Sequence, residues 1–366
     1  MKEAIVDKTT TVTLRDIDIP VAKPGQVLIK VIVSGTNPKD WKLPAWLADV
    51  APYNQGDDIA GYIEAVGDGV RNFKKGDKVA AFHQMRTSGG SYAEYAIAWE
   101  HTTFHVPEKT SFEGMIYLRF PTLSMGWFIN IEYVEAATIP LAAMTAALGL
   151  YQRLSLPVPW NPATGQLPLV VYGGASAVGS FAIKLAQLSN IHPIIAVAGR
   201  GAAYVETLID RSKGDTIVDY REGEEALRKN IQAAAGGKPI HHAYDAVSEK
   251  GSYQNLGAVL TAPAKITVVL PGKDYSDVPE GVQIQSTNVG SVHQPPVAGQ
   301  TIGDIEFGHA FFALFGRGLA QGWFTGHPHE VRPGGLPALE GALHDLKSGK
   351  ASAVKYVVRI ADTPGL

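Results

Sequence analysis

The chain lacks cysteine altogether. This absence excludes disulfide bonds, cysteine nucleophiles and thiolate metal sites, and it is typical of a reducing compartment. No uninterrupted run of about 18 apolar residues is present, so we expect no membrane span. The polar N-terminal stretch MKEAIVDKTT also lacks the apolar segment of a signal peptide. Together these absences predict a soluble, cytoplasmic protein.

An excess of charge of one sign is also missing. The 366 residues include 32 basic and 35 acidic side chains, which are interspersed and give a net charge of −3. Without a basic stripe, neither nucleic acid nor an anionic membrane is expected as a partner. Hydrophobic residues make up 45% of the chain, enough for a sizeable core. The length fits one large domain or two ordinary ones.

The hydrophobic pattern changes near residue 168. Before it, runs such as QVLIKVIVSG (26–35) and GYIEAVGDGV (61–70) are typical of strands closed by glycines. After it, apolar runs such as PLVVYGG (168–174) alternate with helical stretches such as VGSFAIKLAQLSN (178–190). This alternation predicts a doubly wound α/β fold with a parallel sheet covered on both faces. The tail (334–360) is expected to form a helix and a strand that return to the first domain.

A glycine-rich loop, GGASAVG (173–179), joins the first of these strands to its helix. It is close to the dinucleotide fingerprint G-x-G-x-x-G. We expect Gly174 to make the tight turn and Gly179 to let the helix pack closely, while Ser176 replaces the middle glycine. The following helix N-terminus would bind phosphate, with the Ser176 hydroxyl as an additional donor. A plain strand-to-helix turn is the open alternative, whereas a nucleophile elbow would need glycine at position 178, which is valine.

The end of the second strand of this domain discriminates between NAD and NADP. An acidic residue there would bind the ribose 2′-hydroxyl, but AVAGRG (196–201) offers Arg200 and no acid. A guanidinium binds a 2′-phosphate by charge-assisted hydrogen bonds, and Tyr220 at the end of the third strand adds a hydroxyl. These residues favour NADPH, with a solvated surface arginine as the open alternative.

The histidine pairs predict no metal site. His241 and His242 are adjacent on an expected strand and therefore face opposite sides. His327 and His329 flank a proline in an expected loop. Neither pair has the helical H-x-x-x-H spacing of zinc enzymes, so we expect packing or surface histidines and no bound metal.

Several stretches together resemble the medium-chain dehydrogenase/reductase superfamily along nearly the whole chain. They are KPGQVLIKVIVSGTNPKDWK (23–42), GDDIAG (56–61), VGDGVRNFKKGDKVAAF (66–82), PLAAMTAALGLY (140–151), GGASAVG and KASAVKYVVRI (350–360). MKEAIV, NPKDWK and AFHQM are most similar to fungal ToxD-like oxidoreductases and to trans-acting enoyl reductases of polyketide pathways. The resemblance implies a GroES-like β-rich catalytic domain (1–140), a Rossmann NADPH-binding domain (141–322) and a return to the catalytic domain (323–366).

Departures from the zinc alcohol dehydrogenases of this superfamily indicate its zinc-independent, quinone oxidoreductase-like branch. Those enzymes have a catalytic cysteine where this chain has SGTNPKD (34–40), and Gly-His-Glu where it has Gly56-Asp57-Asp58. Their lobe with four structural cysteines is missing here. Without a Lewis acid, oxidising an unactivated alcohol is hard, whereas a polarised C=C bond or a quinone accepts hydride more readily. We interpret Asp57 and Asp58 as a structural turn, with paired acid–base carboxylates as the alternative.

The resemblance also implies which residues bind the cofactor. Those expected beside the nicotinamide half are Lys39, Asp40, Trp41 and Lys42, with Thr145 close by. Those expected to face the pyrophosphate are Gly174, Ala175, Ser176, Ala177 and Val178. The 2′-phosphate would be held by Gly199, Arg200 and Tyr220, and the nicotinamide end would be lined by Leu270, Pro271, Val289 and Val354.

The implied reaction transfers hydride from NADPH to the β-carbon of an α,β-unsaturated carbonyl compound, or to a quinone. The developing enolate oxygen needs a donor, and the tyrosine that some enoyl reductases use is absent from WKLPAWLADV (41–50). Lys42 is the best local candidate for a catalytic cation, while contact with the cofactor ribose or solvation of the rim is the open alternative. Solvent would supply the α-proton.

These features imply an NADPH-dependent, zinc-independent reductase of activated C=C bonds or quinones in fungal secondary metabolism. One alternative is a trans-acting enoyl reductase on chains bound to a polyketide synthase carrier domain, and another is a non-catalytic NADPH-binding protein. The expected partners are a small-molecule enone or quinone, a carrier domain if the enzyme acts in trans, and a second copy if it is a homodimer.

An atypical insertion, GMIYLRFPTLSMGWFINIEYV (114–134), interrupts the family pattern. Its 21 residues are rich in aromatic side chains and show no clear period. Their removal restores a continuous SFEEAATIP, so we hypothesise that they are translated from an unspliced intron or result from a gene-model error. The alternative is an apolar loop that clamps a substrate or a dimer partner, or that hinders folding by exposing apolar surface.

Sequencing the spliced transcript tests this hypothesis. We expect the mature message of the native host to join the codon of Glu113 directly to that of Glu135, because only this junction restores the family pattern. A mature message that keeps the 21 codons contradicts the hypothesis.

Overall fold

The structure is a computed structural model that describes residues 1–47, 49, 52–107, 133–294 and 304–366. The chain divides into two compact units. Unit 1 comprises Met1–Leu141 and Gly290–Leu366, and unit 2 comprises Ala142–Val289. Among the described residues, no helix is both long enough and apolar enough to cross a membrane.

Unit 2 is built on a six-stranded parallel sheet in the order β10-β9-β8-β11-β12-β13. Numbered along the chain, this is the order 3-2-1-4-5-6 of doubly wound folds, so the predicted α/β architecture is confirmed. The strands are β8 (Leu169–Tyr172), β9 (Ile194–Ala198), β10 (Thr216–Asp219), β11 (His242–Asp245), β12 (Ala264–Val268) and β13 (Val282–Ser286).

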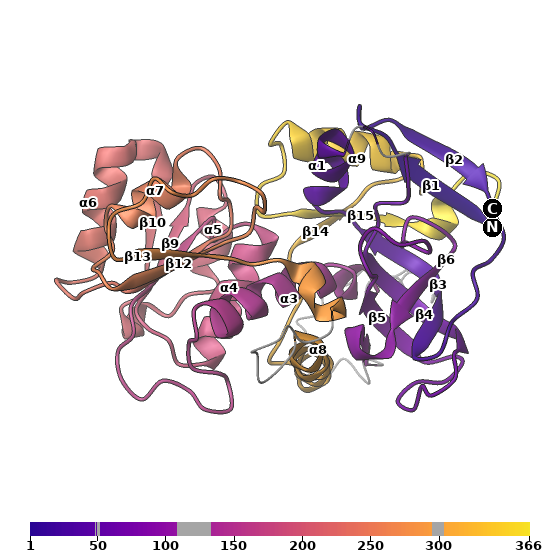
Figure 1. Cartoon of the computed structure of the whole chain (residues 1–366), viewed down its shortest axis with the longest axis horizontal. Helices are drawn as coiled ribbons and strands as arrows, with labels where there is room; N and C mark the ends of the chain where they lie inside the picture. The colour runs from indigo at the N-terminus through magenta and orange to yellow at the C-terminus, as the bar shows by residue number, and fades with distance from the viewer. Residues whose placement is uncertain (48, 50–51, 108–132, 295–303) are drawn as a thin grey trace, which may run out of the picture. The chain divides into compact units, whose positions relative to one another are not determined.

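Helices cover both faces of this sheet, as the continuous apolar runs of its strands predict. Leu227 of α6 and Leu256 of α7 pack on one face together with Val170 and Ile195. Figure 1 shows α4, which buries Phe181, on the opposite side of the sheet. The helical segments are η2 (Leu148–Arg153), α4 (Ala177–Leu188), α5 (Ala202–Glu206), η3 (Arg211–Lys213), η4 (Tyr220–Glu222), α6 (Glu224–Ala234) and α7 (Ser252–Gly257).

Unit 1 contains a seven-stranded sheet in the order β14-β15-β3-β4-β5-β7, with β6 paired to β3, and a separate β1-β2 hairpin. The C-terminal strand β15 runs antiparallel to β3, with Val358 opposite Ser34. The tail therefore lies in the N-terminal sheet, and Figure 1 shows the two chain ends side by side. The strands are β1 (Lys2–Val6), β2 (Val12–Asp16), β3 (Gln26–Gly35), β4 (Asp58–Val66), β5 (Lys78–Phe82), β6 (Tyr95–Trp99), β7 (Thr103–His105), β14 (His329–Val331) and β15 (Lys355–Arg359).

Residues 290–322 cluster with unit 1, whereas the sequence placed them in the nucleotide domain. The reason is the packing of the amphipathic helix α8 on β7, where Phe312 stacks on Phe104 with ring centroids 6.0 Å apart. The other helical segments are α1 (Lys39–Trp46), η1 (Glu100–Thr102), α3 (Pro140–Ala147), η5 (Val289–His293), α8 (Asp304–Gln321), α9 (Ala338–Lys347) and η6 (Ile360–Asp362).

Residues 114–132 of the atypical insertion lie outside the described residues. Its last two residues, Tyr133 and Val134, are described and buried. The Tyr133 ring lies 5.2 Å from that of Tyr62 in β4.

A buried ion pair connects the C-terminal strand to the sheet of unit 1. Lys355 Nζ donates to Asp58 Oδ2 at 2.5 Å, and the two side chains are 3% and 0% exposed. The Asp58 carboxylate also accepts from Asn37 Nδ2 and from the backbone N–H of Leu141, both at 2.7 Å. Asp58 therefore fixes the start of β4, the approach to α1 and the start of α3 at once.

The stability of a variant that lacks the Lys355 ammonium measures how much the fold depends on this ion pair. We expect Lys355→Met to lower the free energy of unfolding by about 3–5 kcal/mol, because the Asp58 carboxylate would stay buried without its cation. The double variant Lys355→Met/Asp58→Asn should recover part of the loss. Urea unfolding at neutral pH measures both changes.

The matched control is Lys350→Met, which removes an ammonium that is 68% exposed and paired with Asp345. Such surface pairs contribute less than about 1 kcal/mol. A loss that small for Lys355→Met as well would contradict the role given to the buried pair.

Candidate functional site

The glycine loop after β8 has the geometry of a phosphate-binding turn. Gly173 has a φ of +78°, a conformation that favours glycine. A Cβ added there would lie 2.6 Å from a methyl carbon of Val247. Gly174, which the fingerprint predicts at the tight turn, has no positive φ and packs against Ile183. The turn is therefore made one residue earlier than predicted, and the doubled glycine was the signal for it.

Ser176 and Gly179 begin α4 in the way a phosphate site requires. The Ser176 Oγ accepts a hydrogen bond from the Gly179 N–H at 3.1 Å, so Ser176 is the N-cap of the helix. A Cβ on Gly179 would lie 2.2 Å from the Gly173 carbonyl oxygen, which explains why glycine is needed there. The N–H groups of Ala177 and Val178, with the positive end of the helix dipole, are free of intrahelical partners by their position in the first turn.

The residues predicted to hold a 2′-phosphate come from the ends of β9 and β10. The ring of Tyr220 packs directly on Gly199. A Cβ added at Gly199 would lie only 2.7 Å from Tyr220 Cε1, so the close contact requires glycine. Tyr220 is 46% exposed, and Arg200 beside Gly199 is also exposed. The structure thus brings Gly199 and Tyr220 together at the edge of the sheet where the phosphate is expected.

An acidic residue near this edge is already neutralised. Asp219, the last residue of β10, accepts from the Nε of Arg221 at 2.9 Å. Hydrogen bonding and the charge of Arg221 hold the pKa of Asp219 below its usual value, so its charge stays paired. Sequence reasoning missed this pair, although the D-Y-R spacing is visible in the sequence.

The remaining predicted residues of unit 2 lie in three places: after β12, in α3 and at the start of η5. Leu270 and Pro271 follow β12, and the Leu270 carbonyl accepts from the Tyr275 hydroxyl at 2.6 Å. The Thr145 carbonyl accepts from Tyr244 in β11 at 2.8 Å. Val289 is buried and begins η5. Because the strands are parallel, their carboxyl ends share one edge, so Leu270, Pro271 and the glycine loop lie at the same edge of unit 2.

In unit 1, the segment around α1 is held by a buried charge network. Lys39 Nζ donates to Asp40 Oδ1 at 2.7 Å and to the Gln55 carbonyl at 2.6 Å, and it forms an ion pair with the Asp57 carboxylate. The Tyr92 hydroxyl donates to Asp40 Oδ2 at 2.6 Å. Lys39 and Asp40, predicted beside the nicotinamide, therefore direct their charged groups into the protein.

His83 extends this network to the next loop. Its Nδ1 lies 2.8 Å from Asp57 Oδ1, and both side chains are almost fully buried. Asp57 and Asp58 are thus bound to different partners, which supports their interpretation as structural residues. Burial alone would raise the pKa of Asp57, but Lys39 and His83 lower it. Burial alone would lower the pKa of Lys39, but Asp40 and Asp57 raise it above its usual value.

Lys42, the predicted catalytic cation, lies one turn further along α1. Its Nζ is 5.4 Å from the centre of the Trp41 ring, and both side chains are partly exposed. Lys347 of α9 lies 5.7 Å from the same ring. Val354, predicted at the nicotinamide end, immediately precedes the buried Lys355, whose Nζ donates to Asn37 Oδ1 at 3.0 Å.

The histidines singled out in the sequence have packing roles. His241 Nδ1 donates to the Thr261 carbonyl at 2.8 Å. His327 is buried, and its backbone N–H donates to the Thr138 hydroxyl. Across the described ranges, no group of three or more His, Asp or Glu side chains is arranged to hold a metal ion.

His293 is a buried histidine that sequence reasoning missed. It ends η5, and its ring centroid lies 5.0 Å from that of Phe82 and 5.9 Å from that of His101. Burial, together with the nearby His101 and His83, lowers the pKa of His293 from about 6.5 to about 3. Asp57 acts in the opposite direction and raises this pKa, but its effect is smaller. The imidazole is therefore neutral in the folded protein at neutral pH.

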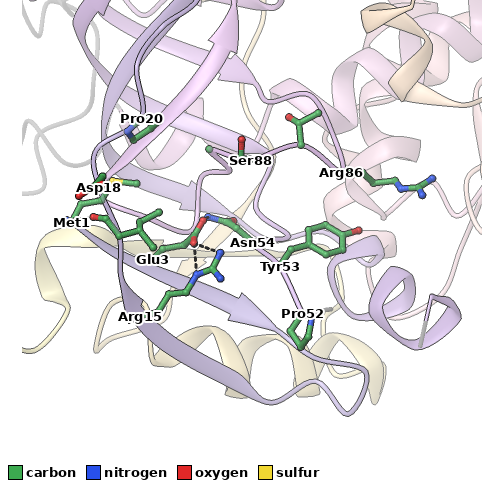
Figure 2. Close-up of a pocket in the computed structure, with 13 residues that line it drawn as sticks. Met1, Glu3, Arg15, Asp18, Pro20, Pro52, Tyr53, Asn54, Arg86 and Ser88 are labelled. Atoms are coloured by element: carbon green, nitrogen blue, oxygen red, sulfur yellow. Dashed lines mark hydrogen bonds and ion pairs between the residues drawn. The ribbon is translucent and has the colours of Figure 1, made fainter. Parts of the chain in front are cut away.

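A separate pocket of about 560 Å³ lies between the β1–β2 hairpin and the segments 52–54 and 86–89 of unit 1. Figure 2 shows Arg15 reaching across to Glu3, to whose carboxylate its Nε donates at 2.7 Å. The lining residues include none of those predicted to bind cofactor or substrate, so the pocket is not the predicted nicotinamide site.

A family model, the alcohol dehydrogenase GroES-like domain, matches residues 23–108. This range spans β3 to β7 together with α1, so the predicted GroES-like domain is confirmed.

The chain is similar to a curated protein over most of its length. The trans-enoyl reductase fsr4 of Gibberella fujikuroi is 46% identical over 338 residues, which cover 91% of this chain and 91% of that protein. The quinone oxidoreductase of Coxiella burnetii superposes with a TM-score of 0.69 at 22% identity, covering 98% and 99% of the two chains. The crotonyl-CoA carboxylase/reductase AntE, solved in complex with NADP, has a TM-score of 0.73 at 15% identity and coverages of 99% and 95%. At such identities these two structures show the fold alone.

The lowered pKa of His293 predicts a loss of stability in acid. The unfolded chain binds a proton near pH 6.5, whereas folded His293 resists protonation until about pH 3. Each pH unit below about 6.5 should therefore remove up to about 1.4 kcal/mol of unfolding free energy through this group. We expect His293→Gln to flatten the slope of stability between pH 6.5 and 4.5, as measured by urea unfolding.

The control is His344→Gln, which replaces an exposed histidine of α9 and should leave the slope as in the wild type. If His293→Gln and His344→Gln gave the wild-type slope alike, the neutral buried state assigned to His293 would be wrong.

Proposed function

The chain belongs to the trans-enoyl reductases of the medium-chain dehydrogenase/reductase superfamily, and on this premise we propose that it is an NADPH-dependent enoyl reductase. Its substrate would be an α,β-unsaturated acyl group attached as a thioester to a polyketide synthase carrier domain. The observation that carries the proposal is the glycine loop after β8, at the point where the strand order of the sheet reverses.

The residues of unit 2 fit a phosphorylated dinucleotide. Gly173 and Gly179 keep side chains away from the turn, and the first turn of α4 offers backbone donors for the pyrophosphate. Arg200 and the exposed Tyr220 supply a charge and a hydroxyl for a 2′-phosphate, while Asp219 is paired with Arg221. This balance of charge supports NADPH over NADH. The residues that remain predicted neighbours of the cofactor are Thr145, Leu270, Pro271 and Val289.

Lys42 is the residue of α1 proposed to act on the substrate. When bound, NADPH supplies a hydride. Reduction of an enoyl group places negative charge on its carbonyl oxygen, and the Lys42 ammonium would stabilise this charge. Lys39 does not suit this role, because its ammonium is already hydrogen-bonded to Asp40 and Gln55 and ion-paired with Asp57. The proton for the α-carbon would come from solvent.

A comparison of acceptors and cofactors tests this function. With the purified protein, we expect NADPH oxidation to be fastest when the enoyl group is carried on a carrier domain, and slower with the same group on a small thiol or with free enones and quinones. Arg200→Ala should raise the KM for NADPH by about 10–100-fold, the value of one or two charge-assisted hydrogen bonds, and leave the KM for NADH unchanged.

Arg211→Ala is the matched control, since Arg211 is also an exposed arginine of unit 2 and its guanidinium binds Glu206. It should leave both KM values as in the wild type. Tight NADPH binding without oxidation by any of these acceptors would contradict the proposal and favour a non-catalytic NADPH-binding protein.

A further inference from the structure

The ammonium group of Lys39 is enclosed by oxygen atoms from two separate segments of unit 1. One acceptor, Asp40, lies within α1, and the other two, Gln55 and Asp57, precede β4. Two of the three N–H donors of the ammonium go to Asp40 and to the Gln55 carbonyl, and the Asp57 carboxylate is within ion-pair distance. The Lys39 side chain is 16% exposed, and the carboxylates of Asp40 and Asp57 are 0% and 2% exposed.

Two carboxylates and a carbonyl are the oxygen ligands that bind hard metal cations in proteins. Here they converge on a cation that is covalently part of the chain. Asp57 and Asp40 would repel each other if Lys39 were neutral, and burial would make both charges costly. The raised pKa of Lys39 keeps it protonated, which suits a permanent cation and excludes Lys39 as a proton donor.

The start of α1 has few local features that stabilise a helix, which makes the contacts of Lys39 and Asp40 important there. α1 has only eight residues, contains Pro44, and begins after Pro38 without a side-chain cap hydrogen bond. Asp40 takes over the capping role, since its Oδ2 accepts from the Asn37 N–H at 2.7 Å. Asp40 in turn is held by Lys39 and by the Tyr92 hydroxyl.

We propose that the Lys39 ammonium is a permanent cation that holds the first turn of α1 against the segment before β4. By fixing the start of this helix, Lys39 positions Lys42 for enoyl reduction. Lys42 follows Lys39 by three residues and so shares its side of the helix. Lys39 is a positioning residue, and only the turnover readout of the test below rests on the proposed function.

Chemical rescue of Lys39→Ala tests the proposal. This variant removes three carbons and the ammonium, which n-propylammonium replaces, while 1-propanol fills the same space without charge. We expect Lys39→Ala to lower kcat/KM by about 10²-fold, as a small misplacement of Lys42 would, and to lower Tm by roughly 5–15 °C. n-Propylammonium should raise both values, and 1-propanol should not.

The KM for NADPH should change less than about threefold, because the residues proposed to hold its phosphates lie in unit 2. Lys8→Met, which removes an exposed lysine of unit 1, should match the wild type in all readouts. If Lys39→Ala is not obtained folded, Lys39→Arg should still fold and should lose less activity than Lys39→Met, because it keeps a cation.

Wild-type values for Lys39→Ala, a rescue by 1-propanol equal to that by n-propylammonium, or no rescue by either would overturn the proposal. So would Lys39→Arg behaving like Lys39→Met. If the wild type reduces no acceptor, the proposed function fails, but the Tm readout with n-propylammonium still decides the role of Lys39.

Discussion

Two carboxylates that are adjacent in the sequence, Asp57 and Asp58, are each neutralised by a lysine from a different part of unit 1. Lys39 reaches Asp57 from α1, and Lys355 reaches Asp58 from β15. Both carboxylates are at most 2% exposed, and an uncompensated charge at that depth would be strongly unfavourable. The helix that carries Lys42, the start of β4 and the C-terminal strand are therefore assembled together, and this assembly defines the unit 1 part of the candidate site.

The constraint on unit 2 is the parallel direction of its strands. It places the glycine loop, the Gly199–Tyr220 contact and Leu270 at the same edge of one sheet, although they are up to about 100 residues apart in the chain. The positive end of α4 and the charge of Arg200 then lie at an edge whose acid, Asp219, is already paired. The proposed preference for a dinucleotide that carries an extra phosphate rests on these positions.

The sequence predicted the parts of this structure that depend on local pattern. The Val/Ile runs from Leu169 onward predicted the parallel sheet, and GGASAVG predicted the tight turn into α4, although the turn is made by Gly173. The sequence could not predict contacts made across long distances in the chain. Lys355 and Asp58 are 297 residues apart, and nothing local indicates their pairing. For the same reason the sequence did not indicate that Lys39 and Asp40, which are predicted beside the cofactor, have Asp57 and Tyr92 as partners.

Lysine ammonium groups balance the buried carboxylates of unit 1, and the proposal built on this balance is that enoyl reduction needs no metal ion. Its most direct test measures zinc content and NADPH-dependent reduction of a carrier-bound enoyl thioester on the same chelator-treated sample. Our account predicts an unchanged rate when zinc is far below one ion per chain. A rate that falls with the zinc content and returns when zinc is added back would contradict it.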